Sequence, residues 1–205
     1  MAVAVVAAAA GLTGCGSAGV TPPAPPTGSG GLAPDQLPIP AGRGPRFRLP
    51  AVSPGVAGRA RIAGQACATV HPPSYGVHLE LYADRLVLPV PSGIGVAPPQ
   101  QRRGVYVLGG ACSYGLRTLE PTGVVVVDRG ARAAAPTLGT LFAIWGQPLS
   151  AGSLAGFDGP VVAFLGGRRW SGSPQAIPLR RHAEIVLQVG GELPPHPAYL
   201  FPPGL

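Results

Sequence analysis

The chain has 205 residues and a net charge of +7, and all 15 of its basic side chains are arginine. The arginines stand singly or in pairs, without a basic helix or interleaved aromatic residues, so the charge does not indicate nucleic-acid binding. Beyond an N-terminal segment rich in Pro and Gly, the chain is long enough for one ordered domain of about 150 residues.

An apolar segment opens the chain and ends at a cysteine. Residues 2–12 are too few to cross a bilayer as a helix but have the length of a signal-peptide core. The sequence LTGC, residues 12–15, resembles the bacterial lipobox, which implies cleavage after Gly14 and diacylglyceryl attachment to Cys15. Because no basic residue precedes the apolar run, we expect the natural start to lie upstream of Met1. The alternative is a buried apolar segment with an incidental cysteine.

These features divide the chain into four parts. Residues 1–14 form a predicted signal peptide, and residues 15–55 a lipidated cysteine with a Pro- and Gly-rich tether. Residues 56–192 form a predicted globular β-rich domain, and residues 193–205 a Pro-rich C-terminal tail. The expected location is the extracytoplasmic face of the cell membrane, with attachment through the lipid.

Short apolar stretches bounded by Gly and Pro predict β-strands. Residues 77–82 alternate, with apolar side chains on one face and His78, Glu80 and Tyr82 on the other. Residues 85–90 follow after a two-residue turn, so the two stretches predict a hairpin, with Pro89 placing its second strand at an edge. Further strands are predicted at 104–108, 123–128, 160–166 and 183–189.

One segment has helical periodicity. Residues 137–146 begin at a candidate N-cap, Thr137, end at Gly146, and carry an apolar stripe formed by Leu138, Leu141, Phe142 and Trp145. We therefore expect an α+β, mainly β fold, in which a twisted antiparallel sheet carries one short packed helix. The order of hairpin, helix and later strands favours a β-grasp-like arrangement, with an immunoglobulin-like β-sandwich as the alternative.

Two cysteines remain once Cys15 is assigned to the lipid. Cys67 and Cys112 are an even pair in a chain that carries an export signal, which favours a disulfide between them. Two free buried thiols are the alternative.

Catalytic motifs are incomplete. The sequence ACSYG around Ser113 approaches a nucleophile elbow, with Asp158 and His182 as conceivable partners, but no helix is predicted directly after the serine. A blue-copper site needs two His and one Cys and usually an axial Met, but the only Met is Met1 and no His follows Cys112 within fifty residues. We therefore do not expect an enzyme, and a serine hydrolase is only a second alternative.

A looser metal site is conceivable on the predicted hairpin. His78 and Glu80 share one strand face, with His71 nearby in sequence. An imidazole and a carboxylate are ligands that zinc and copper accept. A strand face with these residues is more often solvated, and this is the simpler interpretation.

Four stretches together resemble an uncharacterised family of exported or membrane-anchored bacterial proteins. They are residues 76–96 (GVHLELYADRLVLPVPSGIGV), 112–128 (CSYGLRTLEPTGVVVVD), 137–150 (TLGTLFAIWGQPLS) and 177–191 (IPLRRHAEIVLQVGG). The resemblance implies a cluster of histidines on neighbouring strands, as in a metal site. This sequence keeps His78 of that set; the other positions hold Gly76, Arg117, Leu119 and Val126, and Glu120 replaces an aspartate.

The sequence thus predicts a membrane-anchored, non-catalytic binding or structural module with a degenerate metal site. The alternative is an exported protein that binds zinc or copper weakly through His78, Glu80 and Glu120. The expected partners are the membrane, through the lipid anchor, and a protein or small ligand; no nucleic acid is expected.

Overall fold

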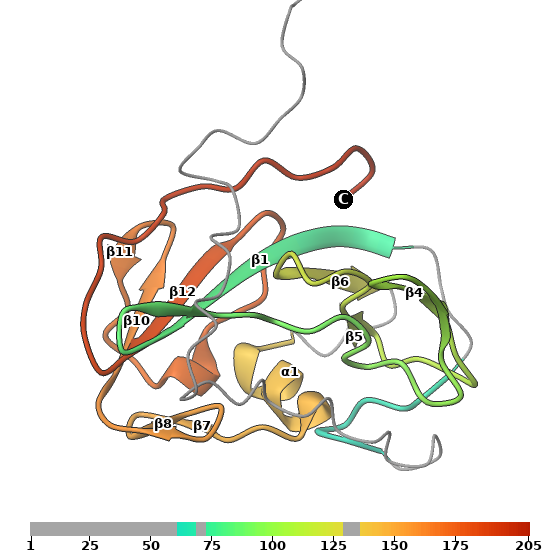
Figure 1. The fold of residues 1–205 in the computed structure, drawn as a ribbon, viewed down its shortest axis with the longest axis horizontal. Coiled ribbons are helices and arrows are strands. Elements are labelled where there is room, and N and C mark those ends of the chain that lie inside the picture. Colours follow the sequence, from blue (N-terminus) through green and yellow to red (C-terminus); the bar gives the residue numbers. More distant parts are fainter. Residues whose placement is uncertain (1–60, 69–72, 129–135) are drawn as a thin grey trace, which may run out of the picture. The chain divides into compact units, whose positions relative to one another are not determined.

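The computed structural model describes residues 61–68, 73–128 and 136–205, except for the side chain of Ser74 (Figure 1). These residues belong to a single compact unit. The predicted signal peptide, Cys15 and the tether lie outside the described residues, as does His71.

A mixed sheet of seven strands organises the described part of the chain. Its order is β11-β10-β12-β1-β6-β5, with β2 also paired to β1. The strands are β1 (Pro73–Ala83), β2 (Leu86–Leu88), β5 (Leu116–Arg117), β6 (Val124–Asp128), β10 (Val161–Leu165), β11 (Arg168–Arg169) and β12 (Glu184–Val189). The predicted strands at 123–128, 160–166 and 183–189 are therefore confirmed to within a residue or two at each end.

The central pair of strands departs from the expected antiparallel pattern. β1 and β12 run parallel, whereas the other neighbouring pairs in this sheet are antiparallel. A parallel first and last strand at the centre, with antiparallel strands on each side and a helix between the two halves, is the β-grasp-like order. The α+β, mainly β prediction is confirmed.

The predicted hairpin joins β1 to β2. Leu81 pairs with Leu88 and Ala83 with Leu86. The turn residues Asp84 and Arg85 both have positive φ, 50° and 66°, which is the primed turn geometry that matches strand twist. β2 ends just before Pro89, because proline lacks the N–H that would continue the ladder.

Two small ribbons accompany the main sheet. β3 (Gln101–Arg103) pairs with β4 (Tyr106–Gly109), near the strand predicted at 104–108. The second ribbon contains β7 (Leu149–Ser150), β8 (Ser153–Leu154) and β9 (Phe157–Asp158), and a 3₁₀ turn, η2, covers Pro174–Ala176.

The helix α1 spans Leu138–Trp145, inside the predicted range. The Thr137 side chain accepts from the Thr140 backbone N–H in a capping box, and Gly146 ends the helix in the left-handed region with φ of 74°. All four residues of the predicted stripe are buried. They pack in the same apolar core as Val77 and Leu79, which alternate along β1. No helix among the described residues is long and apolar enough to cross a membrane.

The opposite face of the sheet is covered by the C-terminal tail. Residues 193–205 contain no helix or strand, yet Figure 1 shows this segment running past β1 and β12 on the side away from α1. The Gln188 side chain exchanges two hydrogen bonds with the Leu193 backbone. A Cβ at Gly76 would approach Phe201 to 2.8 Å, so glycine permits the tail to lie close to β1. The expectation that this strand face is solvated is therefore wrong.

A disulfide joins Cys67 to Cys112, with their Cα atoms 5.5 Å apart. Beside it, the backbones of Ala68 and Ser113 exchange two hydrogen bonds. The bridge spans 45 residues of sequence and includes the first hairpin in its loop. In the chain-entropy account, a loop of this length contributes about 4 kcal/mol to the free energy of unfolding.

Replacement of Trp145 tests the packing of α1 on the sheet. Trp145→Ala should lower the free energy of unfolding by about 3–5 kcal/mol, because the side chain is 1% exposed and its loss leaves a cavity. Trp145→Phe should cost much less, since the indole N–H has no hydrogen-bond partner among the described residues. Urea unfolding measures both variants, and equal stability of Trp145→Ala and wild type would contradict the helix packing.

Candidate metal centre

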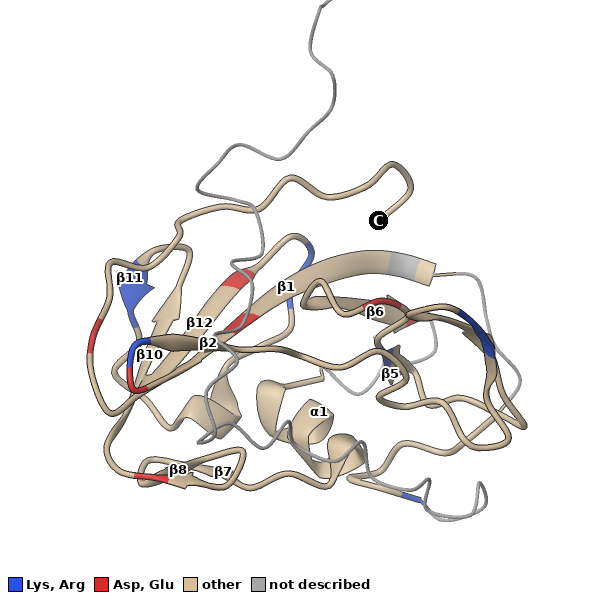
Figure 2. Ribbon diagram, in the orientation of Figure 1, with Lys and Arg blue, Asp and Glu red and all other residues tan. Residues whose placement is uncertain are grey.

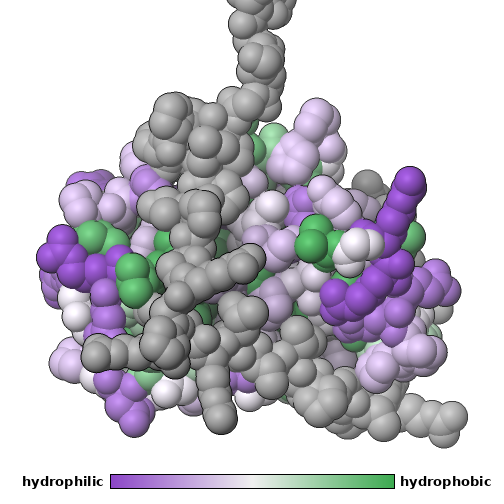
Figure 3. All heavy atoms as spheres, viewed as in Figure 1, coloured by the Kyte–Doolittle hydropathy of each residue, from purple (hydrophilic) through white to green (hydrophobic). Residues whose placement is uncertain are grey.

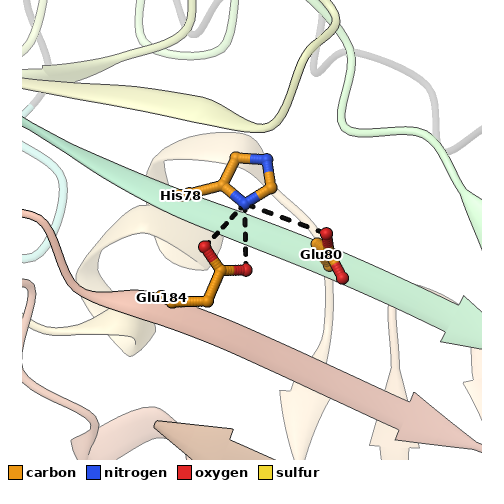
Figure 4. Close-up of side chains that lie close together, drawn as sticks. All are labelled: His78, Glu80 and Glu184. Carbon is orange, nitrogen blue, oxygen red and sulfur yellow. Dashed lines mark hydrogen bonds and ion pairs between the residues drawn. The ribbon is translucent and has the colours of Figure 1, made fainter. Parts of the chain in front are cut away.

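The register of the parallel central pair places His78 directly beside Glu184. In β1 and β12, position 78 is opposite position 184 and position 80 opposite position 186. Side chains alternate along a strand, so His78 and Glu80 share the face that the tail covers. Glu184 projects to the same face, and three polar side chains meet on two adjacent central strands (Figure 4).

The three side chains are close enough to share one ion. The His78 Nδ1 atom lies 2.9 Å from both carboxylate oxygens of Glu184 and 4.0 Å from Oε1 of Glu80. One donor atom from each residue lies within 4.8 Å of the other two. His78 and Glu184 are each only 2% exposed.

The second nitrogen of His78 is fixed by the backbone. Nε2 donates its proton to the Thr122 carbonyl oxygen over 2.9 Å, because a carbonyl can only accept. Gly123 makes room for this contact: a Cβ there would lie 2.4 Å from the Leu79 carbonyl oxygen and 3.1 Å from Nε2. In the neutral imidazole, Nδ1 is therefore the nitrogen with a free lone pair, and it faces the carboxyl groups.

The tail adds a second imidazole to the cluster. His196 Nδ1 lies 2.8 Å from both oxygens of Glu80, and the Tyr82 hydroxyl donates to Glu80 Oε2 over 3.0 Å. The Tyr199 ring stacks on His78, with the two ring centroids 3.7 Å apart. Two carboxyl groups and two imidazoles thus form one network, buried at His78 and Glu184 and partly exposed at Glu80 and His196, which also holds the tail on the sheet.

Burial determines where the proton between His78 and Glu184 resides. Burial, together with the negative charge of Glu80, raises the pKa of the Glu184 carboxyl to about 9, against the opposing effect of His196. Burial also lowers the pKa of His78 to about 4, against the opposing effects of Glu80 and the Thr122 carbonyl. Near neutral pH, Glu184 is therefore protonated, and its O–H donates to Nδ1 of a neutral His78.

Of the three predicted ligands, the structure brings His78 and Glu80 together but not Glu120. The cluster within the described residues consists of His78, Glu80 and Glu184. Position 78 pairs with Val124 at the start of β6, so Glu120 precedes that strand and lies in the connecting loop. Its charge acts on the tail instead, where it adds to burial in raising the pKa of Tyr199.

Sequence reasoning missed Glu184 and His196. The only signal for Glu184 is an acidic residue at the start of the apolar stretch EIVLQV. Its partner depends on a parallel register across 106 residues of sequence. His196 lies in a Pro-rich tail whose path the sequence does not indicate.

A buried ion pair occupies part of the region where the resemblance implied histidines. Arg117 on β5 binds Asp128 at the end of β6, and both side chains are almost fully buried. Arg117 pairs with Val126 in the ladder. These positions therefore hold the sheet edge together by charge and offer no metal ligand of the expected type.

The described residues do not assemble a serine-hydrolase triad. Ser113 is buried, and its hydroxyl has no hydrogen-bond partner among the described residues. The His182 ring stacks on Phe201, and its Nε2 binds the Leu205 carbonyl oxygen over 2.7 Å. Asp158 belongs to the small ribbon, in β9.

A surface pocket lies beside the cluster. Its volume is about 740 Å³, and it lies between the tail and the segment that leads into β12. Glu184 and Tyr199 line it, and Arg180 stands at the same wall. The Glu184 side chain is itself only 2% exposed, so the pocket lies next to the cluster and does not open it to solvent.

Comparisons of this chain with protein-family models, with curated proteins and with solved structures gave no match. The residues of the cluster are therefore the guide to function.

The pKa of Glu184 predicts how stability depends on pH in the metal-free protein. Between pH 4.5 and 6.5, the lowered pKa of His78 makes the free energy of unfolding increase with pH, and the raised pKa of Glu184 makes it decrease. The two effects offset each other in this range. From pH 6.5 toward 9, native Glu184 holds a proton that the unfolded chain has released, so stability falls as pH rises. The limiting slope is about 1.4 kcal/mol per pH unit.

Glu184→Gln is the matched variant, because its amide can donate to His78 Nδ1 but cannot titrate. Urea unfolding in the presence of a chelator should show a smaller decline above pH 6.5 in this variant than in wild type. Identical pH profiles for the two proteins would contradict the assignment of the proton to Glu184.

Proposed function

We propose that the protein is an exported, lipid-anchored envelope protein whose β domain binds a divalent transition-metal ion. The ligands are His78, Glu80 and Glu184 from the two central strands, and His196 from the tail would join them by moving from the Glu80 carboxylate to the ion. The observation that carries this proposal is the meeting of three ligand-type side chains within 4.8 Å beneath the tail, whose His196 binds one of them.

The surroundings of His78 support a role as a metal ligand. A metal-bound imidazole typically donates its other N–H to a carbonyl or carboxylate, which fixes the ring. Here Nε2 donates to the Thr122 carbonyl and leaves Nδ1 directed at the carboxyl groups. The Tyr82 hydroxyl orients Glu80 in the same manner.

The distances suit an ion of the size of zinc. Four ligands at about 2.0–2.1 Å in a tetrahedron lie about 3.3 Å from one another. The Nδ1 atom of His78 is now 2.9 Å from Glu184 and 4.0 Å from Glu80, so shifts below 1 Å would bring both carboxylates to that spacing. Two imidazoles and two carboxylates are also ligands that copper accepts, and copper binds more strongly at a given nitrogen and oxygen site.

A site with four protein ligands favours binding over catalysis. Catalytic zinc sites keep one position open for water or substrate, whereas structural sites are closed by protein side chains. Because His196 comes from the tail, the ion would also fasten residues 193–205 to the sheet. We therefore propose a non-catalytic role, in which metal binding and the structure of the tail support each other.

Metal and proton compete for the same atoms. The proton between Glu184 and His78 must leave before a metal ion can bind both, and the pKa of about 9 for Glu184 makes that loss costly at low pH. Metal affinity should therefore increase from pH 6.5 to pH 8, with proton release that titration calorimetry in two buffers can measure.

The metal site can be tested by calorimetry of the full chain with zinc and with copper. We expect a dissociation constant of about 1 µM or below for the wild type. His78→Ala and Glu184→Gln should each weaken binding by about 100-fold or more, since loss of a ligand exceeds the effect of an outer-sphere partner.

Glu120→Gln is the matched control and should leave the affinity unchanged, because Glu120 is outside the cluster. Absence of wild-type binding at about 100 µM metal would contradict the proposal. A wild-type affinity of Glu184→Gln for the metal would also contradict it. In that case the cluster only holds the tail on the sheet through hydrogen bonds.

The lipid anchor rests on LTGC at residues 12–15, with the apolar segment before it and the tether after it. Cells that express the gene, including any upstream codons, should incorporate labelled palmitate into the protein. Cys15→Ser should abolish the label and move most of the protein out of the membrane fraction. Unlabelled wild-type protein would exclude the anchor.

A further inference from the structure

The hairpin formed by β3 and β4 exposes apolar side chains at its tip. Val105 is 56% exposed, Tyr106 51% and Leu108 67%. Five large hydrophobic residues of the described chain are exposed, and these three fall within four consecutive positions. The hairpin is a separate two-stranded ribbon, outside the main sheet.

The local structure holds these side chains outward. Val107 is 1% exposed and points into the protein, and its backbone N–H donates to the Leu119 carbonyl. Because side chains alternate along a strand, Tyr106 and Leu108 must face the solvent when Val107 is buried. Gly104, with φ of 61°, makes the turn that places Val105 at the tip.

The same hairpin carries positive charge without acidic neighbours in sequence. Arg102 and Arg103 lie on β3, opposite Val107 and Tyr106, and no Asp or Glu occurs between Asp84 and Glu120. Figure 2 shows blue segments on this ribbon, and in Figure 3 purple and green atoms adjoin on that side of the protein.

The two arginines differ in their contacts. The Arg102 guanidinium is turned back to Ser92 and Gln100. Arg103 is exposed, and no ion pair links it to an acidic side chain in the described part of the chain. Its positive charge is thus available to an anionic group that contacts the tip of the hairpin.

We propose that the β3–β4 hairpin docks onto an anionic lipid surface, with Val105, Tyr106 and Leu108 in the interface and Arg103 against the headgroups. Tyrosine beside small apolar side chains and arginine is the composition of an interfacial anchor. A stable protein partner would need about 800 Å² on this side, which three side chains do not supply, whereas shallow insertion needs only such a tip.

This docking site would act together with a lipid anchor but does not depend on one. A diacylglyceryl group carries two acyl chains and attaches a protein stably by itself, so the hairpin would orient the domain at the membrane surface. The hairpin also leaves the metal ligands untouched, because it contains none of them.

Vesicle sedimentation of the full chain carrying Cys15→Ser tests the hairpin without a lipid anchor and without added metal. The vesicles contain phosphatidylcholine, with or without phosphatidylglycerol. The parent should bind the anionic vesicles about tenfold more tightly than the neutral ones, and added salt should reduce the difference. Val105→Asp with Leu108→Asp should weaken binding to anionic vesicles by about tenfold or more.

Leu86→Asp with Leu200→Asp is the control, because these two side chains are also exposed, at 43% and 50%, and the change in charge is identical. This control should bind within about twofold of the parent. Thermal unfolding verifies that both double variants fold. Equal losses of vesicle binding in the two double variants would overturn the proposal. Equal binding of the parent to anionic and neutral vesicles would also overturn it. Neither result bears on metal binding or on the lipidation of Cys15.

Discussion

The parallel pairing of β1 with β12 is the constraint on which both faces of the sheet depend. It joins residues 73–83 to residues 184–189 at the centre of the sheet, although about one hundred residues separate them in the chain. On one face this register aligns the apolar side chains that receive α1. On the other it places His78 beside Glu184. A shift by one residue would exchange the faces, moving the polar side chains under the helix and exposing the core.

The polar face is stabilised by the bond between its most buried titratable groups, His78 and Glu184. A buried charge is costly, and Glu184 avoids that cost by keeping its proton and sharing it with His78. The tail contributes Tyr199, which stacks on His78, and His196, which binds Glu80. A metal ion would provide the alternative solution, since its charge would stabilise both carboxylates at once. The same residues can therefore hold the tail on the sheet in two ways, through hydrogen bonds in the protonated cluster or through a shared metal ion.

The proposed metal site and the proposed membrane-docking hairpin differ in burial and polarity. The metal site lies under the tail, and its polar side chains form hydrogen bonds to one another. The β3–β4 hairpin is exposed, and its apolar side chains have no covering segment among the described residues. A protein held near a membrane by a tether gains orientation from such a hairpin, because the tether alone restricts distance and leaves rotation free.

The sequence by itself determined the local elements. The helix at 137–146 carries its own cap, stripe and terminating glycine, and the hairpin at 77–88 follows from alternation and a short turn; both signals are local. The disulfide between Cys67 and Cys112 was also predictable, because these were the two cysteines left after Cys15 was assigned to the lipid. Only the tertiary structure decided that β1 and β12 are parallel neighbours, that Glu184 takes the place expected of Glu120, and that the tail covers His78. Those outcomes depend on long-range pairing and on burial, for which periodicity and spacing contain no signal.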